Sequence, residues 1–235
     1  MDVSGKKAVV FGGTSGIGLA TVEMLAAAGA QVVAISRDPS KATSLPDGVS
    51  VEACDVRDIA AMDALLTRLA PFDILVSAAT GGTRAMGPFL EMDMDGYKAS
   101  FDKLWGYANV LRYGAAHVTD GGSITLVSGA PARNCKPGQV ALSSVGSAVE
   151  ALVRAVAKET APRIRVKVVS PGTIDTPMVA LKGEERNALY SQMTQANLVP
   201  RAGTANEVAA GLMFVISNGF VTGTTVDVDG GWLLS

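Results

Sequence analysis

The fold is decided by the stretch Ala8-Val9-Val10-Phe11-Gly12-Gly13-Thr14-Ser15-Gly16-Ile17-Gly18. Its first four residues are apolar and predict a buried strand, and a helical pattern follows over residues 16–28. The turn between them has the spacing Gly-x-x-x-Gly-x-Gly. Such a turn lets the backbone approach a pyrophosphate, which the free N–H groups of the helix N-terminus then bind. The alternative is a turn that needs its glycines only for positive φ, but the strand before it and the helix after it favour the phosphate site.

Short apolar runs alternate with helical patterns along the rest of the chain. The further strands are predicted at 31–35, 49–53, 73–76, 123–127, 164–169 and 224–228, and the further helices at 58–69, 97–117, 140–160 and 207–217. This alternation predicts βαβ units and therefore a parallel sheet with helices on both faces. We expect an α/β fold in which residues 1–235 form a single doubly wound Rossmann-type domain.

The composition narrows the class of protein. A chain of 235 residues with 48% hydrophobic residues can build one large core and is not disordered. Its 20 Lys and Arg against 22 Asp and Glu give a net charge of −2, which lacks the basic bias of a nucleic-acid binder. Cys54 and Cys135 form neither a disulfide framework nor a metal-ligand spacing. There is no signal-peptide pattern and no run of about 18 apolar residues, so we expect a cytoplasmic protein without a membrane segment.

Further motifs lie after the later strands. They are Asp55-Val56, Ser170-Pro171-Gly172-Thr173-Ile174-Asp175-Thr176-Pro177, Val221-Thr222-Gly223 and Val228-Asp229-Gly230-Gly231. Together with the turn at 12–18, and in the same order, they resemble the motifs of the short-chain dehydrogenases/reductases. The resemblance covers essentially the whole chain. It implies a doubly wound seven-stranded sheet, and a homodimer or homotetramer as the assembly.

The resemblance also implies which residues hold a nicotinamide dinucleotide. They are Gly12, Thr14, Ser15, Gly16, Ile17 and Gly18 in the turn, Asp55 and Val56 beside the adenine, Ser77 and Ala79 after the fourth strand, and Pro171, Gly172, Ile174 and Thr176 beside the nicotinamide. The family's Asn-Asn-Ala-Gly after the fourth strand has drifted here to Ser77-Ala78-Ala79-Thr80.

The end of the second strand indicates which dinucleotide binds. An acidic residue there would accept hydrogen bonds from a ribose 2′-hydroxyl and repel a 2′-phosphate. This chain has Ser36 followed by Arg37, whose guanidinium can pair with a phosphate. Asp38 follows and could neutralise Arg37, and Arg37 could also be an ordinary solvated arginine. We predict a preference for NADP(H).

The resemblance breaks at the catalytic residues. In the family a Tyr exchanges the proton of the carbonyl oxygen, a Lys holds the nicotinamide ribose and lowers the Tyr pKa, and a Ser hydrogen-bonds the reacting oxygen. Ser128 matches the serine, but Leu142 stands at the tyrosine position and Gly146 at the lysine position. No tyrosine lies between Tyr113 and Tyr190, so a small shift of the alignment cannot restore the pair.

A lysine stands where the family has its helix asparagine. That residue is Lys103, and we hypothesise that it points into the site and replaces the lost ammonium group, holding the ribose or the substrate oxygen. A partly desolvated lysine can have a lowered pKa and donate a proton. The alternative is a surface lysine. Ser128 can stabilise a developing oxyanion, or it can be a strand-end hydroxyl that only satisfies the backbone.

Two other segments complete the interpretation. Residues 176–203 carry the weakest sheet signal, and we expect them to form a substrate lobe over the strand ends. Arg163, Arg165 and Lys167 alternate with apolar residues along the sixth strand, which we interpret as a strand pattern and not as a nucleic-acid patch.

The sequence thus predicts an NADP(H)-dependent oxidoreductase with an atypical site. It would transfer hydride to or from a small carbonyl, alcohol or activated double bond, with Ser128 and Lys103 as the candidate catalytic residues. The missing Tyr and Lys support an alternative of another class, a catalytically inactive dinucleotide-binding sensor or partner subunit.

Overall fold

A seven-stranded parallel sheet forms the centre of the computed structural model, which describes residues 1–42, 44–80 and 83–235. Its strands are β1 (Lys7–Phe11), β2 (Gln31–Ser36), β3 (Ser50–Ala53), β4 (Phe72–Ser77), β5 (Val118–Val127), β6 (Arg165–Pro171) and β9 (Thr225–Val228). They lie in the order β3-β2-β1-β4-β5-β6-β9, and every neighbouring pair is parallel. The doubly wound sheet predicted from the sequence is confirmed. The order of the strands reverses between β1 and β4, where the crevice for a ligand opens in such sheets.

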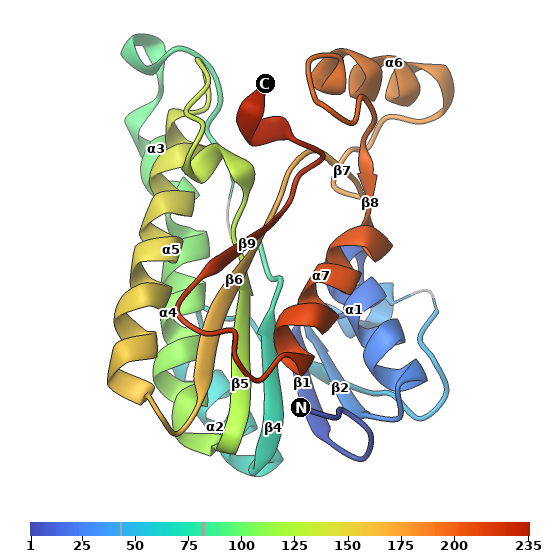
Figure 1. The fold of residues 1–235 in the computed structure, drawn as a ribbon. Helices are drawn as coiled ribbons and strands as arrows, with labels where there is room; N and C mark the ends of the chain where they lie inside the picture. The colour runs from blue at the N-terminus through green and yellow to red at the C-terminus, as the bar shows by residue number, and fades with distance from the viewer. Residues whose placement is uncertain (43, 81–82) are drawn as a thin grey trace.

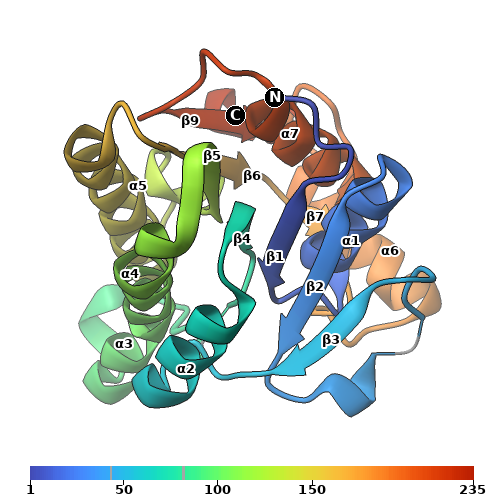
Figure 2. The same ribbon diagram turned by 90° about the horizontal axis from the view of Figure 1, so that it is seen from below.

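Helices cover both faces of the sheet (Figures 1 and 2). One face carries α1 (Gly16–Ala27) and α7 (Ala205–Ser217), and the other carries α2 (Ile59–Leu69), α4 (Asp102–Gly114) and α5 (Val140–Thr160). Each face has its own core of aliphatic side chains. The strands β1 and β2 are largely apolar, as expected where both faces of a sheet are covered.

The long helix α5 lies in one of these cores. It spans 21 residues and is apolar enough to cross a membrane by length and composition alone. Its residues Val149 and Val153 are fully buried in the core that α2 and α4 share with the sheet. The hydrophobicity of α5 is therefore that of a core helix.

The helix predicted at 97–117 is divided. The chain forms α3 (Met94–Ser100), breaks at Phe101, and continues as α4 and the short 3₁₀ helix η3 (Ala115–His117). The first helix begins earlier than predicted because the side chain of Asp93 accepts hydrogen bonds from the backbone N–H groups of Asp95 and Gly96. The remaining 3₁₀ helices are η1 (Pro39–Lys41), η2 (Phe89–Glu91), η4 (Ala130–Ala132) and η5 (Trp232–Leu234).

The predicted lobe contains a helix that the sequence reading missed. It is α6 (Gly183–Thr194), which lies beyond the carboxyl ends of the strands and next to the small sheet formed by β7 (Ile174–Asp175) and β8 (Gly203–Thr204) (Figure 1). Arg186 of α6 fastens the lobe by pairing with Asp175 and by donating a hydrogen bond of 2.8 Å to the carbonyl oxygen of Thr176. The lobe is thus a folded unit, and its contact with substrate stays a prediction.

Candidate active site

The glycine-rich turn between β1 and α1 leaves no room for a side chain at Gly12 or Gly18. Gly12 and Gly16 have φ of 76° and 51°, which favour glycine. A Cβ on Gly12 would lie 2.9 Å from the backbone nitrogen of Ala79, and one on Gly18 would lie 2.0 Å from the Gly12 oxygen. Ser15 caps α1 without a side-chain hydrogen bond, so the first N–H groups of the helix stay open to a ligand. This cradle fits a pyrophosphate.

The predicted nicotinamide-side residues meet the same turn. A Cβ on Gly16 would lie 3.5 Å from the Cβ of Thr176, so the segment after β6 faces the start of α1. Gly172 donates a hydrogen bond of 3.2 Å to the Val228 oxygen, and a Cβ at that glycine would lie 2.6 Å from the oxygen of Asp229. The structure thus brings the predicted motifs at 12–18, 170–177 and 228–231 to one edge of the sheet.

The predicted adenine-side residues lie at the ends of β2 and β3. Arg37 is exposed, and the Ser36 hydroxyl accepts a hydrogen bond of 3.1 Å from the backbone N–H of Asp38. The Asp55 carboxylate accepts a bond of 2.9 Å from the backbone N–H of Arg57. Burial opposes the ionisation of Asp55, but hydrogen bonds and positive charge from Arg57, with a contribution from Arg37, hold its pKa below the usual value.

Two predicted residues of this group are buried. Val56 packs under α4, where a Cβ on Gly106 would lie 2.5 Å from its Cγ2 atom. The hydroxyl of Ser77, at the end of β4, is buried without a hydrogen-bond partner in the part of the chain that the structure describes. A ligand at the strand ends would supply such a partner for Ser77.

Lys103 points inward from the first turn of α4. Its Nζ donates a hydrogen bond of 3.1 Å to the Ser128 oxygen and lies 5.5 Å from the centre of the Tyr107 ring. Desolvation, helped by the positive charge of Arg84, lowers the pKa of Lys103 to about 7. The geometry is not that of a surface lysine, because the amine donates to a backbone oxygen directly after β5, at the carboxyl end of the sheet.

Ser128 lies beside the position of the missing lysine. It is 5% exposed, and its Oγ donates a hydrogen bond of 3.3 Å to the oxygen of Gly146. A Cβ on Gly146 would approach the Cβ of Ala132 to 2.8 Å. The helix η4 therefore fills the space into which a side chain at 146 would grow, and α5 cannot supply a lysine without moving η4.

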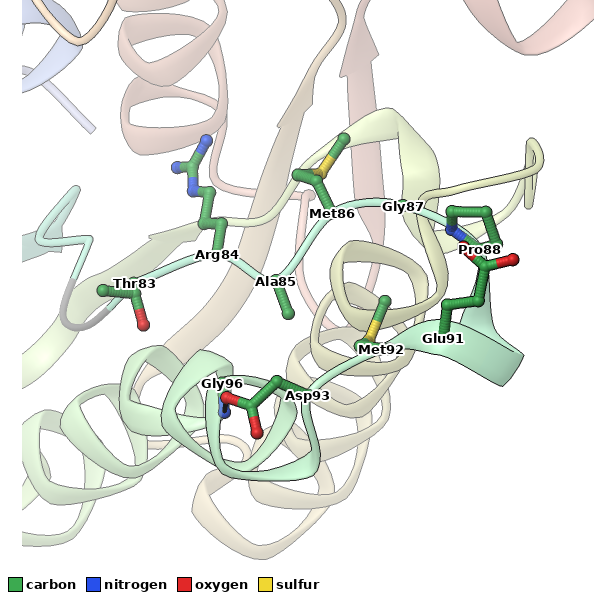
Figure 3. Close-up of a pocket in the computed structure, with 10 residues that line it drawn as sticks. All are labelled: Thr83, Arg84, Ala85, Met86, Gly87, Pro88, Glu91, Met92, Asp93 and Gly96. Carbon is green, nitrogen blue, oxygen red and sulfur yellow. Dashed lines mark hydrogen bonds between the residues drawn. The ribbon is translucent and has the colours of Figure 1, made fainter.

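Arg84 is a site residue that the sequence reading missed. It belongs to the loop after β4, and in Figure 3 its side chain extends away from Glu91 and Asp93, which line an open pocket of about 450 Å³ with it. Its positive charge contributes to the lowered pKa of Lys103 and opposes the rise in the pKa of Tyr107 that burial causes. Desolvation lowers the pKa of Arg84 itself. A single arginine in an irregular loop has neither periodicity nor motif, so no sequence signal marked it.

The described residues hold no metal site. Over 1–42, 44–80 and 83–235, no group of three His, Cys, Asp or Glu side chains could hold a metal ion. The candidate site offers the hydroxyl of Ser128, the amine of Lys103, the guanidinium of Arg84 and the cradle at 12–18.

Comparison with known proteins places the chain in a family. Residues 12–233 match the family model described as enoyl-(acyl carrier protein) reductase. L-xylulose reductase of Mus musculus is 30% identical over 243 residues, which cover 99% of this chain and 98% of that protein.

Solved structures agree. A small-chain dehydrogenase crystallised in complex with NADPH is 31% identical, with a TM-score of 0.82 and coverage of 98% of this chain and 99% of that one. A short chain dehydrogenase/reductase family protein is 29% identical, covers 100% of both chains and has a TM-score of 0.87. The chain therefore belongs to the short-chain dehydrogenase/reductases, a family of oxidoreductases.

Proposed function

We propose that this protein is an NADP(H)-dependent oxidoreductase that interconverts a small carbonyl compound and its alcohol, with Lys103 as the proton donor. The observation that carries the proposal is the inward amine of Lys103, 3.1 Å from the Ser128 oxygen at the carboxyl end of β5. The names of the relatives support the reaction class, since they include L-xylulose reductase and a dehydrogenase in complex with NADPH.

The cofactor site has the elements that NADP(H) needs. The turn at 12–18 and the open N-terminus of α1 would hold the pyrophosphate. Ser36 and Arg37 would hold the 2′-phosphate, and Thr176 lies beside the turn on the nicotinamide side. When bound, NADPH supplies the hydride. The protein's own residues must then place the substrate and provide the proton.

Lys103 is suited to provide the proton. A general acid works best when its pKa is near the working pH, and the pKa of Lys103 is lowered to about 7. Its hydrogen bond to the Ser128 oxygen uses one of three donors, so two remain for the carbonyl oxygen of a substrate or for a ribose hydroxyl. Ser128 would position that oxygen through its hydroxyl, which donates a hydrogen bond to the Gly146 oxygen.

The test measures binding and turnover in the same variants. NADPH binding is followed by fluorescence, and NADPH oxidation is measured with a panel of keto sugars and small ketones. Lys103→Met should lower turnover by about 10² to 10⁴-fold and leave the fold intact. The matched control is Lys98→Met, because Lys98 lies on the preceding helix α3 with its side chain exposed and paired with Asp95.

Wild-type turnover in Lys103→Met would contradict the role of Lys103. Binding of NADPH without turnover of any carbonyl or double-bond substrate would instead favour the alternative, an inactive sensor or partner subunit. Beyond the missing Tyr and Lys, no feature of the described geometry favours that alternative.

The cofactor preference has its own test. Arg37→Ala should weaken NADPH binding by about tenfold or more, since a charge-assisted phosphate pair is lost, and should leave NADH binding unchanged. If wild-type protein binds NADH as tightly as NADPH, the preference for NADP(H) is wrong.

The assembly is a further part of the proposal. We propose a homodimer or homotetramer, because large apolar side chains are exposed on the helices, among them Trp105 of α4 at 63% and Phe214 of α7 at 49%. Sedimentation velocity at micromolar concentration tests this, and a monomer over the whole range would contradict it.

A further inference from the structure

Two cations share one side of the candidate site without an acidic partner. Among the described residues, Lys103 Nζ contacts only the Ser128 oxygen and the Tyr107 ring, both uncharged. Arg84 donates no hydrogen bond and forms no ion pair within residues 1–42, 44–80 and 83–235. Arg186, in the lobe beyond the strand ends, is a contrast because its guanidinium already binds Asp175 and the Thr176 oxygen.

The nearby carboxylates are committed elsewhere. Asp93 caps α3 through hydrogen bonds from Asp95 and Gly96, and Figure 3 shows that Asp93 and Glu91 lie on the opposite side of the loop from the Arg84 guanidinium. Asp102, next to Lys103 in the sequence, pairs with Arg57 at 2.7 Å. No carboxylate of the described chain therefore balances the two cations, which repel one another across a partly desolvated space.

The cofactor phosphates have other partners in the proposed arrangement. The turn at 12–18 and Arg37 lie at the ends of β1 and β2, whereas Arg84 follows β4 and Lys103 lies against the end of β5 beside Ser128. The uncompensated charge thus lies on the side where a substrate oxygen would meet the proton donor. A carboxylate accepts the fork of a guanidinium in two parallel hydrogen bonds, which makes it the anion that suits Arg84.

We propose that the substrate is a small carbonyl compound that carries a carboxylate, with Arg84 binding the carboxylate and Lys103 facing the carbonyl oxygen. This inference rests on the proposed oxidoreductase function and names its substrate class. Arg84 is then a specificity residue, because a neutral substrate would leave its guanidinium with water as its only partner. A carboxylate would also relieve the repulsion between Arg84 and Lys103.

The test compares 2-oxo acids of three to six carbons with their methyl esters, in which a neutral group one methyl larger replaces the carboxylate. Wild-type protein should reduce the acids with a KM at least tenfold lower than that of the esters. Arg84→Met should remove this preference by raising the KM of the acids, and Arg84→Lys should retain part of it. Arg154→Met, which removes an exposed arginine of α5, is the matched control and should keep the wild-type preference.

A binding measurement separates this inference from the proposed function. The complex with NADPH is titrated calorimetrically with the corresponding 2-hydroxy acids and their methyl esters, which cannot be oxidised by the reduced cofactor. Acids should bind at least tenfold more tightly than esters, and Arg84→Met should abolish the difference. Equal binding of acids and esters, or an acid preference that survives Arg84→Met, overturns the inference. Turnover of esters as good as that of acids overturns it while the oxidoreductase function stands, whereas selective acid binding without turnover contradicts only that function.

Discussion

Two lysines of this chain have pKa values far below the ordinary 10.5, and they lie in different surroundings. Desolvation lowers the pKa of Lys103 to about 7 at the carboxyl end of the sheet, and that of Lys167 to about 6 in the middle of β6, with contributions from Arg84 and Arg165 respectively. The amine of Lys103 has an acceptor, the Ser128 oxygen, and the residue is only partly buried. The amine of Lys167 is fully buried and has no partner within the described residues.

The comparison shows that a lowered lysine pKa indicates desolvation of the amine. Whether the amine can take part in catalysis depends on whether a substrate can reach it. Lys167 pairs in register with Thr125 of β5, and the hydroxyls of Thr125 and Ser123 are also buried without partners in the described chain. A ligand cannot reach this cluster, so its polar atoms only cost stability. Lys103 is also desolvated, but it is only partly buried and its amine contacts the Ser128 oxygen at the carboxyl end of β5.

Lys167→Met should have the largest effect. The folded protein must keep this lysine neutral near pH 7, and at about 1.4 kcal/mol per pH unit below the ordinary pKa this costs up to about 5 kcal/mol. Methionine has a similar volume and no charge, so the free energy of unfolding should rise by an amount of that order without loss of activity. Urea unfolding measures the rise, and a destabilised variant would contradict this account of Lys167.

The pH dependence of this gain follows from the direction of the shift. Because the folded pKa is lowered to about 6, the penalty in the wild type is absent above the unfolded pKa and grows as the pH falls toward 6. The stability difference between Lys167→Met and wild type should therefore shrink by about 1.4 kcal/mol per unit from about pH 7 to 10. Lys98→Met, at an exposed lysine, should show no such trend.

The protonation of Lys103 should also set the pH dependence of wild-type activity. Carbonyl reduction needs the ammonium form, so kcat/KM should fall toward tenfold per unit above the pKa of about 7, or about 50-fold between pH 7 and 9. Oxidation of the alcohol should rise over the same range. Lys167→Met should leave this profile unchanged, and a flat profile in both directions would contradict the role of Lys103.

Gly146→Ala should have a moderate effect on stability. The added methyl would lie 2.8 Å from the Cβ of Ala132, so η4 must shift, which costs about 1 to 3 kcal/mol. Thermal unfolding detects the loss. If Gly146→Ala leaves the stability unchanged, α5 could hold a larger residue at this position. Lys103 need not then be the replacement for the family lysine.

Thr125→Val should have the smallest effect. It removes a buried hydroxyl that has no partner in the described chain and replaces it with a methyl of similar size, so the free energy of unfolding should rise by about 1 kcal/mol. A loss of stability instead would show that the hydroxyl serves the Lys167 amine, directly or through a water, and Lys167→Met combined with Thr125→Val would then recover it.

The sequence predicted the features that have a period or a motif. The turn at 12–18 lies between β1 and α1 as predicted, and α5 has the predicted bounds 140–160. Prediction from the sequence failed where contacts with distant segments of the chain determine the structure. The alternation along the sixth strand predicted the strand itself, but it gave no sign that α7 covers the face of Lys167 and buries its side chain. In α6 only Tyr190 and Thr194 are buried, which leaves no apolar stripe to recognise.

The residues of the candidate site also fall into those that a sequence motif marks and those that it does not. The cofactor motifs are brought together as predicted, because glycines that carry backbone contacts leave a local signature. The inward direction of Lys103 agrees with the hypothesis from the sequence, while its role in catalysis stays a proposal. Arg84 lies in a loop whose place is set by β4 and α3, and a sequence pattern does not report that placement.

The most direct test of the account is the titration of the lysine side chains by NMR with ¹³C at Cε. Lys103→Met and Lys167→Met assign the two signals, and the titration is done with and without NADPH. The account predicts that both amines titrate well below 10.5, near 7 for Lys103 and near 6 for Lys167, and that NADPH shifts only the Lys103 signal. Titration of Lys103 near 10.5, or a Lys103 signal that does not respond to NADPH, would contradict the assignment of Lys103 to the active site.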